Sequence, residues 1–134
     1  MTDDRRLTTD DCFPMTIRRM KTYTGGQGYV YQYYFVGKRA APDAPSSIPA
    51  AEYIFDVTSD RKTTFAVSVL LPEQALGAWA ASHGRRLTDA EQYGAVKMRL
   101  FQAFDEIEDM MADGRRLEVN AGTLDQVLTT LGVQ

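Results

Sequence analysis

Cations and aromatic rings lie close together near the N-terminus, in a pattern that could bind a ligand. Three cations are followed by three tyrosines at alternate positions: Arg18, Arg19, Lys21, Tyr29, Tyr31 and Tyr33. Proteins that bind single-stranded nucleic acid place aromatic platforms beside cations. Tyrosines also gather at protein interfaces, because the ring buries area while the hydroxyl stays hydrogen-bonded. Cross-strand cation–π packing within an ordinary sheet explains the same pattern.

The single cysteine and the single histidine, Cys12 and His83, are the only residues that could support thiol–imidazole chemistry. Cys12 lies in a polar segment without periodicity, which we expect to be a loose tail. His83 continues the apolar face of a predicted helix and lies close to the C-terminal end of that helix, where the helix dipole favours a cation. A structural or capping role is therefore the better interpretation of His83.

An acidic run occupies residues 105–113, which contain five acids and no base. Asp105 and Asp109 are four residues apart and share a helix face, an arrangement that could hold a hard cation. No histidine lies nearby in sequence, so a solvated acidic face is favoured and no metal is predicted. Residues 13–42 contain five cations and no acid. A basic surface, from this segment or from a partner protein, is expected opposite the acids.

The composition limits the class of protein. The chain has 134 residues, of which 44% are hydrophobic and 25% charged, as in an ordinary globular domain. The net charge of −3 argues against non-specific binding of nucleic acid. A lone cysteine forms no internal disulfide, and neither a membrane-length apolar stretch nor an apolar leader is visible. A cytoplasmic location is therefore expected.

The first predicted hairpin joins strands over residues 16–24 and 29–38. A glycine-rich segment, residues 25–28, lies between them. Glycine supplies the positive φ angles of tight hairpin turns. A phosphate-binding loop would instead be followed by a helix, so the turn interpretation is favoured. Both faces of the second strand carry apolar side chains, which suits a strand covered on both sides.

A second hairpin follows a proline-rich loop over residues 40–51, and its register can be predicted. Large apolar side chains alternate along residues 53–58 and 65–71. They share one face only if an odd number of residues separates cross-strand partners. The predicted pairs are Val57 with Phe65, Phe55 with Val67, and Tyr53 with Val69.

Three helices are predicted after the strands. Pro72 begins the first, which ends at Gly84. Thr88 and Glu91 form a capping box for a long amphipathic helix that should continue to Met111. The last helix should span residues 121–131, with Asn120 as N-cap and Gly132 after its end. Residues 115–119 could add a short fifth strand.

These elements predict an α+β fold, because strands precede helices along the chain. An antiparallel four-stranded β-meander should pack against the long amphipathic helix, with two shorter helices. The helix should cover the sheet face that holds Phe55 and Val67. Residues 1–12 are expected to be a flexible tail, and residues 13–134 a single domain.

The leading functional hypothesis is a small cytoplasmic protein-interaction domain, non-enzymatic and homodimeric, with no cofactor and no membrane contact. Its interaction surface would comprise Arg18, Arg19, Lys21, Tyr29, Tyr31, Tyr33, His83, Glu106 and Asp109. One alternative is a small-molecule-binding domain or enzyme, with a pocket between the sheet, the loop at residues 40–51 and His83. Another is a single-stranded nucleic-acid binder that uses the basic, tyrosine-rich hairpin.

Overall fold

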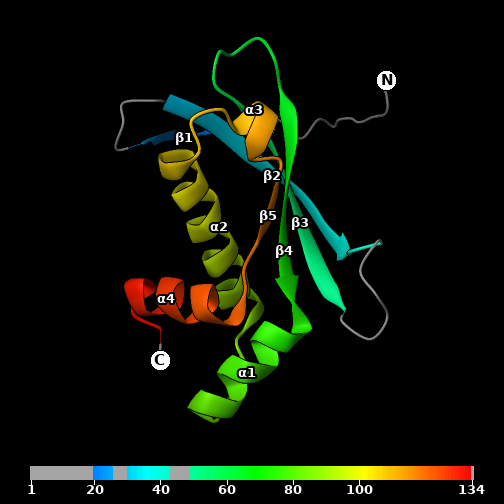
Figure 1. The fold of residues 1–134 in the computed structure, drawn as a ribbon, viewed down its shortest axis with the longest axis vertical. Coiled ribbons are helices and arrows are strands. Elements are labelled where there is room, and N and C mark those ends of the chain that lie inside the picture. Colours follow the sequence, from blue (N-terminus) through cyan, green and yellow to red (C-terminus); the bar gives the residue numbers. More distant parts are fainter. Residues whose placement is uncertain (1–19, 26–29, 43–48, 134) are drawn as a thin grey trace, which may run out of the picture.

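The computed structural model describes residues 20–25, 30–42 and 49–133, and contains a mixed, mostly antiparallel sheet (Figure 1). Its strands follow one another in chain order: β1 (Lys21–Thr24), β2 (Val30–Ala40), β3 (Ala50–Thr58), β4 (Phe65–Pro72) and β5 (Arg116–Glu118). The first four pair antiparallel, whereas β5 pairs parallel to β4. The α+β class is confirmed, but the sheet extends beyond the expected four-stranded meander by this fifth strand.

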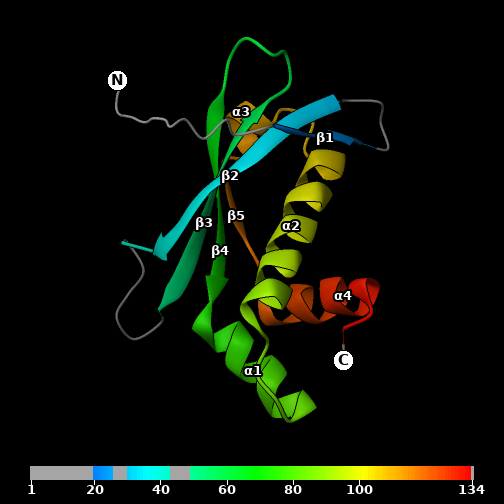
Figure 2. The same ribbon diagram turned by 180° about the vertical axis from the view of Figure 1, so that it is seen from behind.

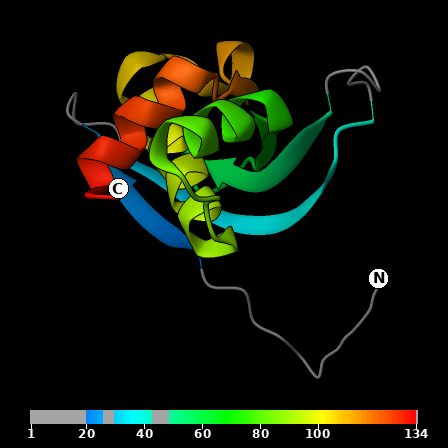
Figure 3. The same ribbon diagram turned by 90° about the horizontal axis from the view of Figure 1, so that it is seen from below.

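The helices gather on one side of the sheet (Figures 1 and 2). They are α1 (Glu73–His83), α2 (Asp89–Glu106), α3 (Met110–Asp113) and α4 (Ala121–Leu131). Seen from below, α1, α2 and α4 lie together on one side of the curved strands β1 to β3 (Figure 3). Across the described ranges, no helix combines the length and apolar character needed to cross a bilayer.

The core lies between the sheet and α2. The register of β3 and β4 is the predicted one, with Val57 opposite Phe65 and Phe55 opposite Val67. All four side chains are buried, and so is Val96 from α2. The alternating apolar row therefore specifies the register, because a slip of one residue would turn it toward solvent.

A β-bulge in β2 changes which side chains face the helices. The register shifts between Phe35 and Gly37, so that β2 carries one residue more than β3 at this point. Beyond the bulge, Lys38 lies opposite Tyr53, and its Nζ is 5.3 Å from the centroid of that ring. Arg39 is thereby turned to the outer face of the sheet, the face away from the helices.

The prediction that the long helix reaches Met111 is wrong. α2 ends at Glu106, and Ile107 is extended, with φ −101° and ψ 115°. The Asp109 carboxylate accepts a hydrogen bond from the Ala112 amide and begins α3. Since an aspartate at a helix N-terminus satisfies otherwise unpaired amides, Asp109 favours a new helix over continuation of the old one. The structure thus contains a third short helix, α3, in addition to the two that were predicted.

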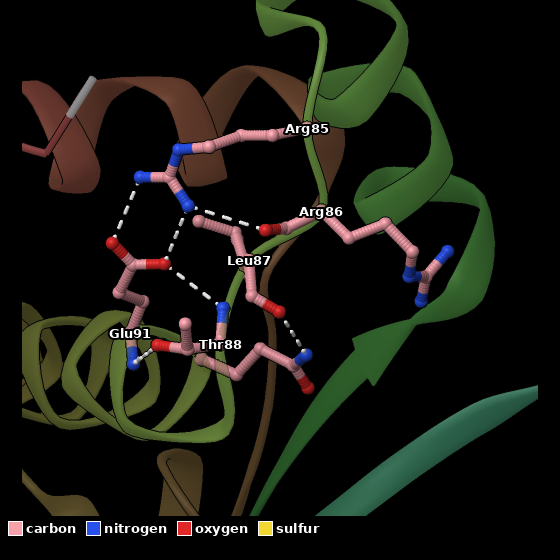
Figure 4. Close-up of polar contacts among 6 residues, drawn as sticks. Arg85, Arg86, Leu87, Thr88 and Glu91 are labelled. Carbon is pink, nitrogen blue, oxygen red and sulfur yellow. Dashed lines mark hydrogen bonds and ion pairs between the residues drawn. The ribbon is translucent and has the colours of Figure 1, made fainter.

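The predicted capping box at the start of α2 is confirmed (Figure 4). The Glu91 amide donates to Thr88 Oγ1 over 3.2 Å, and the Thr88 amide donates to Glu91 Oε1 over 2.8 Å. Arg85 donates from both terminal nitrogens to the same carboxylate, over 2.9 Å each. These bonds lower the pKa of Glu91 to about 2, with the Arg85 hydrogen bond as the main cause. The corner between α1 and α2 is therefore fixed by charge-assisted hydrogen bonds.

Replacing Thr88 with alanine should lower the free energy of unfolding by about 0.5–2 kcal/mol, because the Glu91 amide loses its acceptor. Urea denaturation followed by far-ultraviolet circular dichroism measures this loss. Thr88→Ser, which keeps the hydroxyl, is the matched control and should stay within a few tenths of a kcal/mol of the parent. Equal midpoints for the parent and Thr88→Ala would contradict the role of the cap.

Candidate functional site

The tyrosine row of the first hairpin belongs to the core, which corrects the expectation that it is exposed. Tyr31 and Tyr33 are 3% and 4% exposed. Tyr31 stacks on Phe104 of α2 with centroids 4.3 Å apart, and Tyr33 meets the edge of Phe101 at 5.6 Å. Two phenylalanines on one face of α2 therefore cover the row. Arg18, Arg19 and Tyr29, also predicted for this surface, lie outside the described residues.

The remaining predicted site residues do not gather in one place. Lys21 lies on β1, whereas His83 ends α1 at the opposite end of the molecule (Figure 1). His83 stacks on Trp79 at 4.1 Å, and its Nδ1 lies 3.0 Å from the Trp79 carbonyl oxygen. These contacts agree with the structural interpretation of His83.

The acidic run is divided between local structural roles. Asp105 accepts a hydrogen bond from the Tyr23 hydroxyl over 2.8 Å, which ties the end of α2 to β1. Asp109 caps α3 rather than ending the long helix, and Glu106 is the exposed last residue of α2. Within the part of the chain that the structure describes, no three histidine, cysteine or carboxylate side chains are grouped to hold a metal ion.

The outer face of the sheet is the face away from α1, α2 and α4 (Figure 3). By strand alternation it holds Val30, Gln32, Tyr34, Arg39, Glu52, Ile54, Asp56, Ser68, Leu70, Arg116 and Glu118. Val30 is 44% exposed, and Ile54 and Leu70 are half-buried. In the part of the chain that the structure describes, this face thus presents aliphatic side chains and paired charges to solvent.

A hydrogen-bonded carboxylate organises this face. Glu52 is 4% exposed and accepts from Ser68 Oγ over 2.6 Å and from Arg39 Nε over 2.8 Å. These hydrogen bonds, first Ser68 and then Arg39, hold the pKa of Glu52 below its ordinary value, and the charge of Arg116 adds to the effect. Glu52 therefore stays ionised between two cations and links three adjacent strands.

A second polar pair lies further along the same face. The Tyr34 hydroxyl donates to Asp56 over 2.7 Å between β2 and β3. Its ring and Val30 lie on the same face of β2, which places aromatic and aliphatic surface beside the charged groups. A ring held by its own hydroxyl is a preorganised contact, because little side-chain freedom remains to be lost on binding.

An open pocket of about 350 Å³ lies at one end of the sheet. Its lining comes from the end of β2, the start of β3 and Glu73: Lys38, Arg39, Ala40, Pro49, Ala50, Ala51 and Glu73. The sheet and the end of the proline-rich loop thus line this pocket, and His83 is not among its lining residues.

No family model, curated protein or solved structure matches this chain. The functional interpretation of the outer face therefore rests on its geometry alone. Sequence reasoning could place Ser68 diagonally from Glu52, because the predicted register of β3 and β4 fixes both positions. It could not place Arg39 there, because simple alternation along β2 lacks the extra residue of the bulge.

Proposed function

We propose that the chain is a non-enzymatic protein-interaction domain that pairs with a second copy through the outer face of its sheet. The observation that carries this proposal is the aliphatic and aromatic surface formed by exposed Val30 and half-buried Tyr34, on the face of the sheet that no described helix covers. Two sheets can pack face to face when apolar side chains from each interdigitate. The expected cytoplasmic location remains a prediction.

The charges of the outer face support a second copy as the partner. A two-fold symmetric interface must be complementary to itself, so one patch has to carry both signs. Arg39 and Arg116 supply positive charge, and Asp56 and Glu118 supply negative charge on the same face. Two copies related by a two-fold axis can then bring a cation of one face against an acid of the other.

The structure gives less support to the nucleic-acid alternative. Bases need free ring faces on which to stack. Tyr31 already stacks on Phe104, and Tyr23 stacks on Phe101 with centroids 4.4 Å apart. Small-molecule binding remains the second candidate function, because Lys38 and Arg39 line the pocket at the end of the sheet and would favour an anion.

Replacing Val30 with glutamate should convert a dimer of this chain into a monomer, because a charge would enter the proposed apolar contact. Sedimentation velocity over a range of protein concentrations measures the association. Leu131→Glu is the matched control: Leu131 is 43% exposed but lies at the end of α4, away from the outer face. This variant should remain dimeric.

Circular dichroism should show unchanged secondary structure in both variants, since both positions are exposed. A parent chain that stays monomeric at every concentration would overturn the proposed dimer. Retention of the dimer by Val30→Glu would show that the outer face is not its interface.

A further inference from the structure

A cluster of amines and rings lies on the helix side of the sheet, where the first hairpin meets α2. Lys21 on β1 is the cross-strand partner of Tyr33, and alternation turns both toward α2. Lys97 reaches the same place from α2. Its Nζ lies 6.0 Å from the ring centroid of Tyr33, 5.7 Å from that of Tyr93 and 5.8 Å from that of Phe101.

The second lysine makes this cluster different from an ordinary cation–π contact. Lys97 is half-buried, and burial is the main cause that lowers its pKa. The charge of Lys21 and a hydrogen bond with its side chain lower it further. The three rings favour the ammonium form, but distances near 6 Å make these contacts weak. Burial and a neighbouring cation are the two features that activate lysine amines as nucleophiles in enzymes.

Two of the three rings around Lys97 carry titratable hydroxyls. Burial raises the pKa values of Tyr33 and Tyr93, so both hydroxyls keep their protons and can donate hydrogen bonds. Of the four acids on α2, Asp105 accepts from the Tyr23 hydroxyl and Glu91 accepts from Arg85, whereas Asp89 and Glu106 are exposed. The charge of Lys21, the cross-strand neighbour of Tyr33, would therefore attract an anionic ligand to the amine of Lys97.

We propose that Lys97 is a reactive amine that condenses reversibly with small aldehydes or ketones bearing an anionic group, with Lys21 as the proton donor. The Lys97 nitrogen forms a bond to the carbonyl carbon, and the carbonyl oxygen takes a proton from the Lys21 ammonium. The new nitrogen then returns a proton to Lys21, which passes it to the carbinolamine hydroxyl. The hydroxyl leaves as water while the nitrogen lone pair forms the C=N bond, and the iminium nitrogen gives its remaining proton back to Lys21. The products are an imine and water, without oxidation or reduction.

Glyoxylate, an aldehyde with a carboxylate, is a suitable probe. The full chain is incubated with limiting glyoxylate and cyanoborohydride, which reduces the imine to a stable carboxymethyl-lysine. Peptide mass spectrometry then gives the labelling rate at each of the four lysines: Lys21, Lys38, Lys62 and Lys97. Lys97 should be labelled several-fold faster than Lys38 and Lys62. Lys38 is the matched control, because its Nζ also lies near a tyrosine ring.

Two variants separate reactivity from simple exposure. Lys21→Gln should slow the labelling of Lys97 several-fold and leave that of Lys38 unchanged, whereas Lys21→Arg should retain most of the effect through its charge. Denaturing the parent chain in urea should make the labelling rates of the four lysines equal. Equal rates at Lys97 and Lys38 in the folded chain, or no response of Lys97 to Lys21→Gln, would overturn the proposal.

Discussion

Replacing Phe104 with alanine should lower the free energy of unfolding by about 3–5 kcal/mol, the usual cost of removing a large aromatic side chain from a core. The ring is 1% exposed and lies between α2 and the first hairpin. It stacks on Tyr31 at 4.3 Å and lies 5.7 Å from Tyr23 and 6.2 Å from Tyr33. Its loss would leave a cavity under three tyrosines at once. Urea denaturation of the parent and the variant measures the difference.

Phe101→Ala is the appropriate comparison, because Phe101 lies one turn away on the same helix but is only half-buried. It removes the stack on Tyr23 and little of the deep core. Its cost should therefore be clearly smaller than that of Phe104→Ala. Equal losses of unfolding free energy in the two variants would show that the aromatic core between α2 and the first hairpin is not centred on Phe104.

Replacing Glu52 with alanine should lower the free energy of unfolding by about 1–3 kcal/mol at neutral pH, because the polar groups around it lose their acceptor. Most of this cost should come from Ser68, which is half-buried. The Arg39 side chain is 57% exposed, so water can replace much of its ion pair. Glu52→Gln retains the shape of the side chain and should lie between the parent and Glu52→Ala.

The pH dependence gives this prediction a definite sign. The folded chain holds the pKa of Glu52 below the ordinary value of 4.5, chiefly through the Ser68 hydrogen bond. The unfolded chain therefore binds the proton more readily, and the ionised carboxylate stabilises the fold above about 4.5. That contribution should disappear as the pH falls through the folded pKa. The difference in unfolding free energy between the parent and Glu52→Gln should narrow accordingly, and a difference that is constant with pH would contradict this account.

Local signals in the sequence predicted the parts of the fold that depend on neighbouring residues. The capping box needs only Thr88 and Glu91, three positions apart. The β3–β4 register needs only the alternation of large side chains, such as Phe55 and Val67. The ends of α1 and α4 could also be predicted from the sequence, because Gly84 and Gly132 adopt the positive φ angles expected after a helix.

Other parts depend on contacts between distant segments. The apolar period continues past Ile107 to the buried Met110, so the break between α2 and α3 leaves no gap in the hydrophobic pattern. Tyrosines that could have faced solvent were covered because Phe101 and Phe104 happen to lie over them. Lys97 was missed as a site residue because its partners, Lys21 and Tyr33, come from another part of the chain.

The parallel pairing of β5 with β4 spans a long stretch of chain. Each hairpin closes a short loop, whereas the pairing of β5 with β4 closes a segment that contains both α1 and α2. Contacts between residues far apart in sequence form more slowly, because more chain entropy is lost before they form. Until the Ser68 amide reaches the Arg115 carbonyl and the Val119 amide reaches the Leu70 carbonyl, one edge of β4 is a template for pairing with other chains. A chain that ends before β5 would therefore be prone to aggregate through the open edge of β4, which β5 covers in the complete sheet.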